Sequence, residues 1–104
     1  MRDMLSDKDN EDFKYDSQFV NLRVKPFAIL REIIGTQELI LQLPNRNGGT
    51  TVADLKSKIL ELYPKISVQR IPIGIAINCK VVTNDKLVIN YFDEIALLPP
   101  ISGG

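Results

Sequence analysis

One segment near the middle of the chain carries the local signals of an amphipathic helix. Thr51 and Asp54 have the spacing of a capping box, in which each side chain bonds the other residue's backbone N–H at the start of a helix. Tyr63 precedes Pro64 and is therefore disfavoured in helical conformation. The positions between them predict a helix over residues 52–62, with an apolar stripe that must be buried against another layer: Val52, Leu55, Ile59 and Leu62.

The segments on either side of this helix alternate apolar and polar residues with the period of half-buried strands. Gly35 closes a short helical turn that begins at Ala28, and Asn78 to Lys80 form a tight turn. Pro26 and Pro44 each stop a strand. The expected strands span residues 19–25, 39–43, 73–77, 81–82 and 95–98.

The resulting order is strand, strand, helix, strand, short strand, strand. It fits an α+β β-grasp, or ubiquitin-like, roll, with a mixed sheet of 4–5 strands packed on one main helix. The last strand is expected beside the first, in the centre of the sheet. The predicted organisation is an acidic extension over 1–18, the β-grasp domain over 19–98 and an extended tail over 99–104.

Charge gives little support for nucleic acid or a membrane as a partner. The formal net charge is +0, although residues 1–18 carry six acidic against three basic side chains. No apolar run approaches the roughly 20 residues that span a bilayer. A cytoplasmic location is expected because the N-terminus lacks an apolar signal core and only one cysteine is present.

The chain contains no histidine and a single cysteine, Cys79. The usual general base, the usual metal ligand and every histidine-assisted nucleophile are therefore missing. We expect no metal or cofactor bound by this chain, and catalytic groups supplied by partners. Cys79 itself is interpreted as a bystander, since a reactive thiol needs positive charge nearby to lower its pKa.

The sequence ends in Pro99-Pro100-Ile101-Ser102-Gly103-Gly104. Glycine has no side chain, so a Gly-Gly carboxylate can pass a narrow channel and approach a reacting centre closely. The two prolines fix φ and hold the tail away from the preceding strand. An ordinary chain end is the alternative interpretation, because termini are often poorly ordered.

Over residues 20–104 the chain resembles the small subunit of molybdopterin synthase, the MoaD family of ubiquitin-like sulfur carriers. Phe27-Ala28 with Leu30-Arg31-Glu32, Thr51 to Leu55, Ala76 to Asn78, and Asp93 to Leu98 running into PPISGG carry the resemblance. Two departures are Phe92, where the family places glycine, and the long extension over 1–18.

The resemblance implies a sulfur carrier of molybdenum cofactor biosynthesis. Gly104 would be adenylated by a MoeB-like activating enzyme that uses ATP and Mg, and then converted to a thiocarboxylate. Gly103 would allow passage of the tail into a MoaE-like large catalytic subunit. There the thiocarboxylate would give its sulfur to a cyclic pyranopterin phosphate. The chain would be a non-catalytic, sulfur-donating subunit of a hetero-oligomer, and whether it counts as an enzyme is left open.

The resemblance also places a partner-binding surface near the tail, formed by Phe27, Val81, Leu98, Pro99, Pro100, Ile101 and Ser102. For Phe27, Val81 and Leu98 the alternative is an ordinary core position. Leu98 breaks the inward alternation of Ile95 and Leu97, which favours exposure. Two other functions use the same terminus: a ubiquitin-like protein modifier, and a sulfur carrier of the thiamine or tRNA type.

Overall fold

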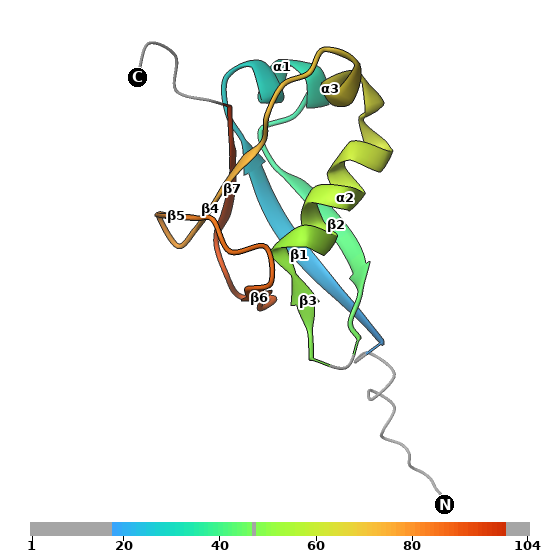
Figure 1. The fold of residues 1–104 in the computed structure, drawn as a ribbon, viewed down its shortest axis with the longest axis vertical. Helices are drawn as coiled ribbons and strands as arrows, with labels where there is room; N and C mark the ends of the chain where they lie inside the picture. The colour runs from blue at the N-terminus through green and yellow to red at the C-terminus, as the bar shows by residue number, and fades with distance from the viewer. Residues whose placement is uncertain (1–17, 47, 100–104) are drawn as a thin grey trace, which may run out of the picture.

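The computed structural model describes residues 18–46 and 48–99. Five strands form one mixed sheet in the order β2-β1-β7-β4-β5 (Figure 1). Their bounds are β1 Phe19–Pro26, β2 Leu39–Pro44, β4 Gly74–Ile77, β5 Lys80–Val82 and β7 Ile95–Leu98. The β-grasp prediction is confirmed, and so are these strands to within two residues.

The centre of the sheet joins the two ends of the domain. β1 and β2 form an antiparallel hairpin in which Val20 pairs with Leu43. β7 runs parallel to β1, with Val24 opposite Ile95, and antiparallel to β4. The prediction that the last strand lies beside the first is therefore confirmed. Because β7 has a neighbour on each side, its backbone is fixed along its whole length.

The helix α2, Val52–Leu62, lies across one face of this sheet (Figure 1). The predicted capping box is present: the Asp54 N–H donates to Thr51 Oγ1 at 3.3 Å, and the Thr51 N–H donates to Asp54 Oδ2 at 3.0 Å. Placing Leu62 in the buried stripe was wrong, because its side chain is exposed. The next helix, α3 (Pro64–Val68), instead buries Ile66 completely at this end of the core.

The core lies between α2 and the sheet face that it covers. Each of the strands β1, β2 and β7 sends alternate side chains into it. The buried apolar cluster contains Leu22, Val24, Leu30, Leu39, Leu41, Leu43, Val52, Leu55, Ile59, Ile66, Ile75, Ile77, Ile89, Ile95 and Leu97. Fully burying such a side chain stabilises the fold by about 1.5–3 kcal/mol relative to leaving it exposed.

Shorter elements complete the domain. The predicted turn after β1 is the helix α1, Ile29–Ile34, ended by Gly35 in left-handed conformation with φ 88°. A second sheet of two strands, β3 (Thr50–Thr51) and β6 (Val88–Ile89), was not predicted. Its strands have two residues each, which is too short for an alternation to be recognised. In the described part of the chain, no helix has the length and apolarity needed to cross a membrane.

Candidate functional site

The strand β7 leads into the C-terminal residues that carry the predicted chemistry. Leu98 ends the strand, and Pro99 follows it with a half-buried side chain. The predicted site residues Pro100, Ile101, Ser102, Gly103 and Gly104 lie outside the described residues, and their roles stay predictions. The described chain thus presents this segment from a central strand of the sheet, between β1 and β4 (Figure 1).

The end of β7 is closely packed against the neighbouring strand. Gly74 lies opposite Leu98 in the register of β4 and β7. A Cβ at position 74 would be 3.3 Å from the Leu98 carbonyl oxygen and 3.6 Å from the Leu98 Cβ. On the other side, the Phe27 N–H donates to the Leu97 carbonyl at 3.1 Å. Because Gly74 has no side chain, Leu98 can lie close to β4 at the end of β7, directly before Pro99.

The sheet face opposite α2 carries a patch of small and apolar residues. The register aligns Lys25 with Ala96, Ala96 with Ala76, and Ala76 with Val81 across four strands. Residues directly opposite each other in neighbouring strands share a face of the sheet. We call this surface the open-face patch; it consists of Lys25, Phe27, Ala76, Val81, Ala96 and Leu98.

The open-face patch includes three of the described residues that were predicted to bind a partner, and the fourth, Pro99, directly follows Leu98. Phe27 is 39% exposed and Val81 is 68% exposed, whereas Leu98 is half-buried. The interpretation of Phe27 and Val81 as core positions is therefore wrong, because neither side chain is buried. A shallow hollow of about 190 Å³ lies on the patch. Its lining includes two small side chains, Ala76 and Ala96, beside the larger Phe27.

The position of Phe27 is fixed by the turn between β1 and α1. The Arg31 guanidinium lies 5.6 Å from the centre of the Phe27 ring, and Arg31 Nε donates to the Pro26 carbonyl at 3.3 Å. Ala28 has φ 54° and ψ −130°, a conformation that normally requires glycine. The Leu30 N–H donates to the Phe27 carbonyl at 3.1 Å and closes the turn. The hydrogen bonds of this turn and the Arg31 contact thus hold an aromatic side chain at the border of the patch, and they offset the strain at Ala28.

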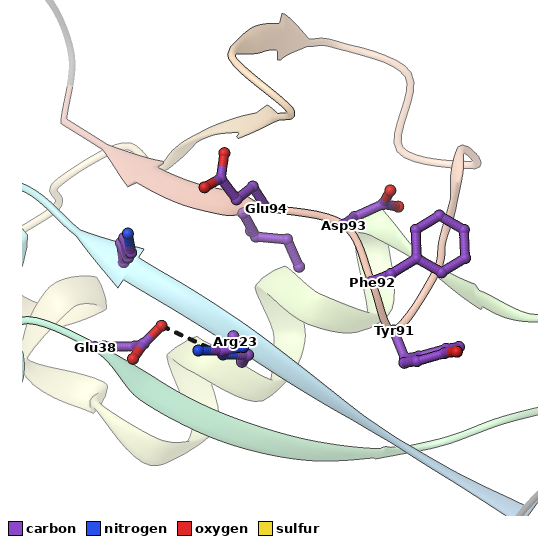
Figure 2. A pocket seen from close by; sticks show the side chains of 8 residues that line it. Arg23, Glu38, Tyr91, Phe92, Asp93 and Glu94 are labelled. Carbon is purple, nitrogen blue, oxygen red and sulfur yellow. Dashed lines mark ion pairs between the residues drawn. The ribbon is translucent and has the colours of Figure 1, made fainter.

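A second hollow, of about 170 Å³, lies beside the patch and is lined by charged and aromatic residues (Figure 2). Arg23 Nε lies 3.5 Å from Glu38 Oε2 on one side of it. Tyr91 and Phe92 come from the loop before β7, with their rings 5.3 Å apart and nearly perpendicular. Both side chains are exposed, so the position where the family places glycine carries an exposed aromatic ring here.

Sequence reasoning missed Lys25, Ala76 and Ala96 as members of the patch. Lys25 could have been included, because it lies two residues before Phe27 and so shares its face of a strand. Ala76 and Ala96 could not, since only the register between β4 and β7 brings them opposite each other. Cys79 is exposed in the turn from β4 to β5 and lines the hollow of the patch.

The arrangement is suited to contact with another protein. Within residues 18–46 and 48–99, no three His, Cys, Asp or Glu side chains are grouped so that they could hold a metal ion. The Asp54 carboxyl has a lowered pKa, but it belongs to the cap of helix α2. The hydrogen bond from the Thr51 backbone N–H lowers this pKa most, and burial opposes the effect. The Thr51 hydroxyl and Arg46 lower the pKa further.

An exposed apolar surface rimmed by polar residues is typical of a protein-binding site.

The fold and this surface define a ubiquitin-like β-grasp protein, and comparison with known proteins identifies its family. The model of the ThiS family matches residues 24–104. The chain belongs to the ThiS family.

Three related proteins agree with this assignment. The molybdopterin synthase sulfur carrier subunit of Arabidopsis thaliana is 35% identical over 89 residues, which are 86% of this chain and 88% of that protein. The solved structure of small archaeal modifier protein 1 from Methanosarcina acetivorans is 29% identical, with a TM-score of 0.64 over 83% of this chain and 98% of that one. The solved structure of a putative molybdopterin converting factor, subunit 1, from Pyrococcus furiosus is 26% identical. Its TM-score is 0.67, over 79% of this chain and 99% of that one.

Proposed function

We propose that this protein is the sulfur carrier subunit of a molybdopterin synthase, and that Gly104 carries the sulfur as a C-terminal thiocarboxylate. The observation that supports this most directly is the 35% identity with the Arabidopsis thaliana sulfur carrier subunit, which extends over most of both chains. The match of the ThiS family includes both terminal glycines.

The proposed chemistry begins with activation of the Gly104 carboxylate. An ionised carboxylate is a poor electrophile, so a separate activating enzyme joins it to AMP from ATP and releases pyrophosphate. A sulfur nucleophile then attacks the acyl carbon, a C–S bond forms, and the C–O bond to AMP breaks. The product is a thiocarboxylate, whose sulfur is transferred to a cyclic pyranopterin phosphate. Two such transfers supply the two sulfur atoms of a dithiolene.

The geometry of β7 supports delivery of this terminus into a partner. The strand is bonded to β1 and β4, so the point at which residue 99 leaves the sheet is fixed. Residues 100–104 span at most about 3.3–3.6 Å each when extended, which places Gly104 up to roughly 17 Å beyond the sheet. Gly103 and Gly104 add no Cβ, so a narrow channel in the partner can accept them.

The open-face patch supports docking of the large catalytic subunit beside the tail. Phe27 and Val81 expose apolar surface on the face of the sheet from which Leu98 also projects. Lys25 and Glu94 add one positive and one negative charge at the same hollow. We propose that this patch is buried in the synthase and that the chain functions within a hetero-oligomer. The catalytic groups for sulfur transfer then belong to the large subunit.

The experiment is a reconstitution in which the purified chain is incubated with an activating enzyme, ATP and a sulfur source, and the C-terminal peptide is analysed by mass spectrometry. We expect an oxygen-to-sulfur mass increase confined to that peptide, and none in a variant lacking Gly104. The modified chain should then form molybdopterin with the large subunit and the pterin substrate. Molybdopterin formation at the normal rate by the variant lacking Gly104 would overturn the proposal.

A second function, covalent modification of proteins, is favoured by the 29% identity with small archaeal modifier protein 1. The same adenylate of Gly104 would then be attacked by a lysine amine of a target, with an isopeptide bond formed and AMP released. After digestion with trypsin, target lysines joined through an isopeptide bond to residues 87–104, the peptide that follows Lys86, would establish this activity if they are absent from cells with the Gly104 deletion. Such lysines and the thiocarboxylate can be measured in the same cells.

A further inference from the structure

One hydrogen bond shows which backbone N–H and C=O groups of the edge strand β2 point away from β1. The Asn45 N–H donates to the Gln18 carbonyl at 2.8 Å, so these two residues form a hydrogen-bonded pair. Such pairs alternate along an antiparallel ladder. In the register of β1 and β2, Leu39, Leu41 and Leu43 therefore bond to β1. The backbone groups of the residues between them point away from the sheet.

The outward groups at the two ends of β2 are already satisfied by threonine hydroxyls. Thr36 Oγ1 donates to the Glu38 carbonyl at 3.1 Å and accepts from the Glu38 N–H at 3.5 Å. At the other end, Thr50 Oγ1 donates to the Pro44 carbonyl at 2.9 Å, and proline has no N–H. The outward groups that remain belong to Ile40 and Gln42.

These groups lie on an edge without the usual protection. β2 is the outermost strand, and among the described residues no strand pairs with its outer side. The sequence of β2, LILQLP, has no charged residue, although exposed edges are commonly protected by lysine or by an inward-pointing charge. Ile40 is 59% exposed at the centre of this edge. An unprotected edge of this kind is a template for a further strand.

We propose that a second copy of this chain pairs with β2 in antiparallel orientation, with a two-fold axis at Leu41. Ile40 of each copy then lies opposite Gln42 of the other, and the four open N–H and C=O groups of one strand meet those of the other. The two Ile40 side chains become diagonal neighbours across the axis. The two five-stranded sheets join into one continuous sheet of ten strands.

The symmetry of the open groups favours a second copy over a different extended segment. The residues with open groups, Ile40 and Gln42, lie one position before and one position after Leu41. The outward groups beyond them on each side are already bonded to threonine hydroxyls. Two antiparallel copies of β2 can therefore pair their open groups with each other. No like charges meet, because the strand is uncharged. β1 separates β2 from β7, so the dimer leaves the open-face patch and the C-terminal segment of both copies accessible.

A single pair of short strands buries less surface than the 1,200–2,000 Å² of a standard interface, which predicts a weak dimer. Sedimentation of the full chain between about 10 µM and 1 mM covers this range of affinity. We expect the average mass to rise from 11.7 kDa towards twice that value with concentration. Ile40→Lys introduces like charges on either side of the axis and should weaken association by about ten-fold or more.

Val68→Lys is the matched control. Val68 is on α3 rather than on β2, and its side chain is 78% exposed. Its replacement by lysine removes an exposed β-branched side chain, as Ile40→Lys does. It should associate as the wild type does, and circular dichroism should show that both variants are folded. Wild-type protein that stays monomeric at the highest concentration, or equal weakening by the two variants, would overturn the proposal.

Cross-linking tests the register separately, in a Cys79→Ser background. Directly opposed, hydrogen-bonded residues have Cα atoms about 5.5 Å apart, within the range of a disulfide, whereas diagonal positions are about 7–8 Å apart. A chain with Ile40→Cys should therefore cross-link with a chain with Gln42→Cys faster than with itself. A mixture of Ile40→Cys and Val68→Cys gives the background rate. A rate at that background for the 40–42 pair would contradict the register.

Discussion

The side-chain amide of Asn78 donates a hydrogen bond to the carboxylate of Asp93 at 3.0 Å, and through it the β4–β5 turn is tied to the loop before β7. The Asn78 side-chain oxygen also accepts from the Glu94 N–H at 2.9 Å, and Asp93 accepts from the Asn90 N–H at 2.8 Å. The loop that carries Tyr91 and Phe92 is therefore anchored at its C-terminal end by one asparagine.

Asn78 makes side-chain hydrogen bonds and also adopts a left-handed backbone conformation, and two substitutions can separate these roles. Its φ is 52°, so Asn78→Ala adds backbone strain to the loss of the side-chain hydrogen bonds, whereas Asn78→Gly loses these bonds without strain and adds only the entropy of glycine in the unfolded chain. We expect Asn78→Gly to lower the free energy of unfolding by about 1–2 kcal/mol, and Asn78→Ala to lower it further. Urea denaturation of the two variants checks this. If Asn78→Gly unfolds at the wild-type midpoint, the anchoring role is wrong.

The cap of α2 should make stability depend on pH. Its backbone hydrogen bond from Thr51 holds the pKa of Asp54 below the ordinary value of 3.8. Because the folded pKa is the lower one, the ionised carboxylate stabilises the fold above the unfolded pKa, and this contribution disappears as the pH falls through the folded pKa. Asp54→Asn should thus be less stable than the wild type at pH 7, with the difference shrinking at acid pH. Urea denaturation of both proteins at a series of pH values measures the difference in their free energy of unfolding. A difference that does not change with pH would contradict the role of ionised Asp54 in the cap.

Ala28→Gly should stabilise the protein. Alanine at φ 54° and ψ −130° carries strain of about 1–3 kcal/mol, which glycine does not. Glycine loses about 0.5–1 kcal/mol through the entropy of the unfolded chain, so we expect a net gain of about 1 kcal/mol. Ala53→Gly, at an exposed position of α2, is the control and should cost about 1 kcal/mol. Thermal unfolding compares them; a lower melting temperature for Ala28→Gly would show that the turn is unstrained.

The open-face patch should be needed for partner binding but not for folding. Val81→Asp places a charge on exposed apolar surface at the centre of β5, and we expect the free energy of unfolding to fall by no more than about 1 kcal/mol, the span of strand propensities. Affinity for the large synthase subunit should fall by about ten-fold or more if the patch is buried there. Val68→Asp serves as the control and should bind normally. Calorimetric titration measures both, and wild-type affinity of Val81→Asp would exclude this edge of the patch from the interface.

Much of the fold could be predicted because single residues determine where helices and strands begin and end. Thr51 and Asp54 define the start of α2, and Gly35 ends α1 in the left-handed conformation that glycine permits. Leu62 was misplaced because helical spacing says which side chains share a face, not how far the neighbouring layer extends. The core at that end is filled by Ile66, from a helix with too few residues for its period to be recognised.

The candidate site was predicted less completely, because it depends on pairing between distant segments. Phe27, Val81 and Leu98 were chosen by resemblance, and in the structure all three lie on or border one face, while their role in partner binding stays a prediction. Ala76 and Ala96 are separated by 20 positions in the sequence, and only the register of β4 and β7 makes them neighbours. The open groups of β2 likewise depend on which hydrogen bonds the hairpin uses.

The parallel pairing of β1 with β7 links delivery of the tail to the integrity of the whole domain. Val24 and Ile95 are opposite each other although 70 residues lie between them, so this contact forms only when almost the entire domain has been synthesised. A chain that has not closed its core does not hold β7 in place beside β1. A protein that binds the open-face patch would therefore recognise folded molecules and leave damaged or incomplete ones unbound.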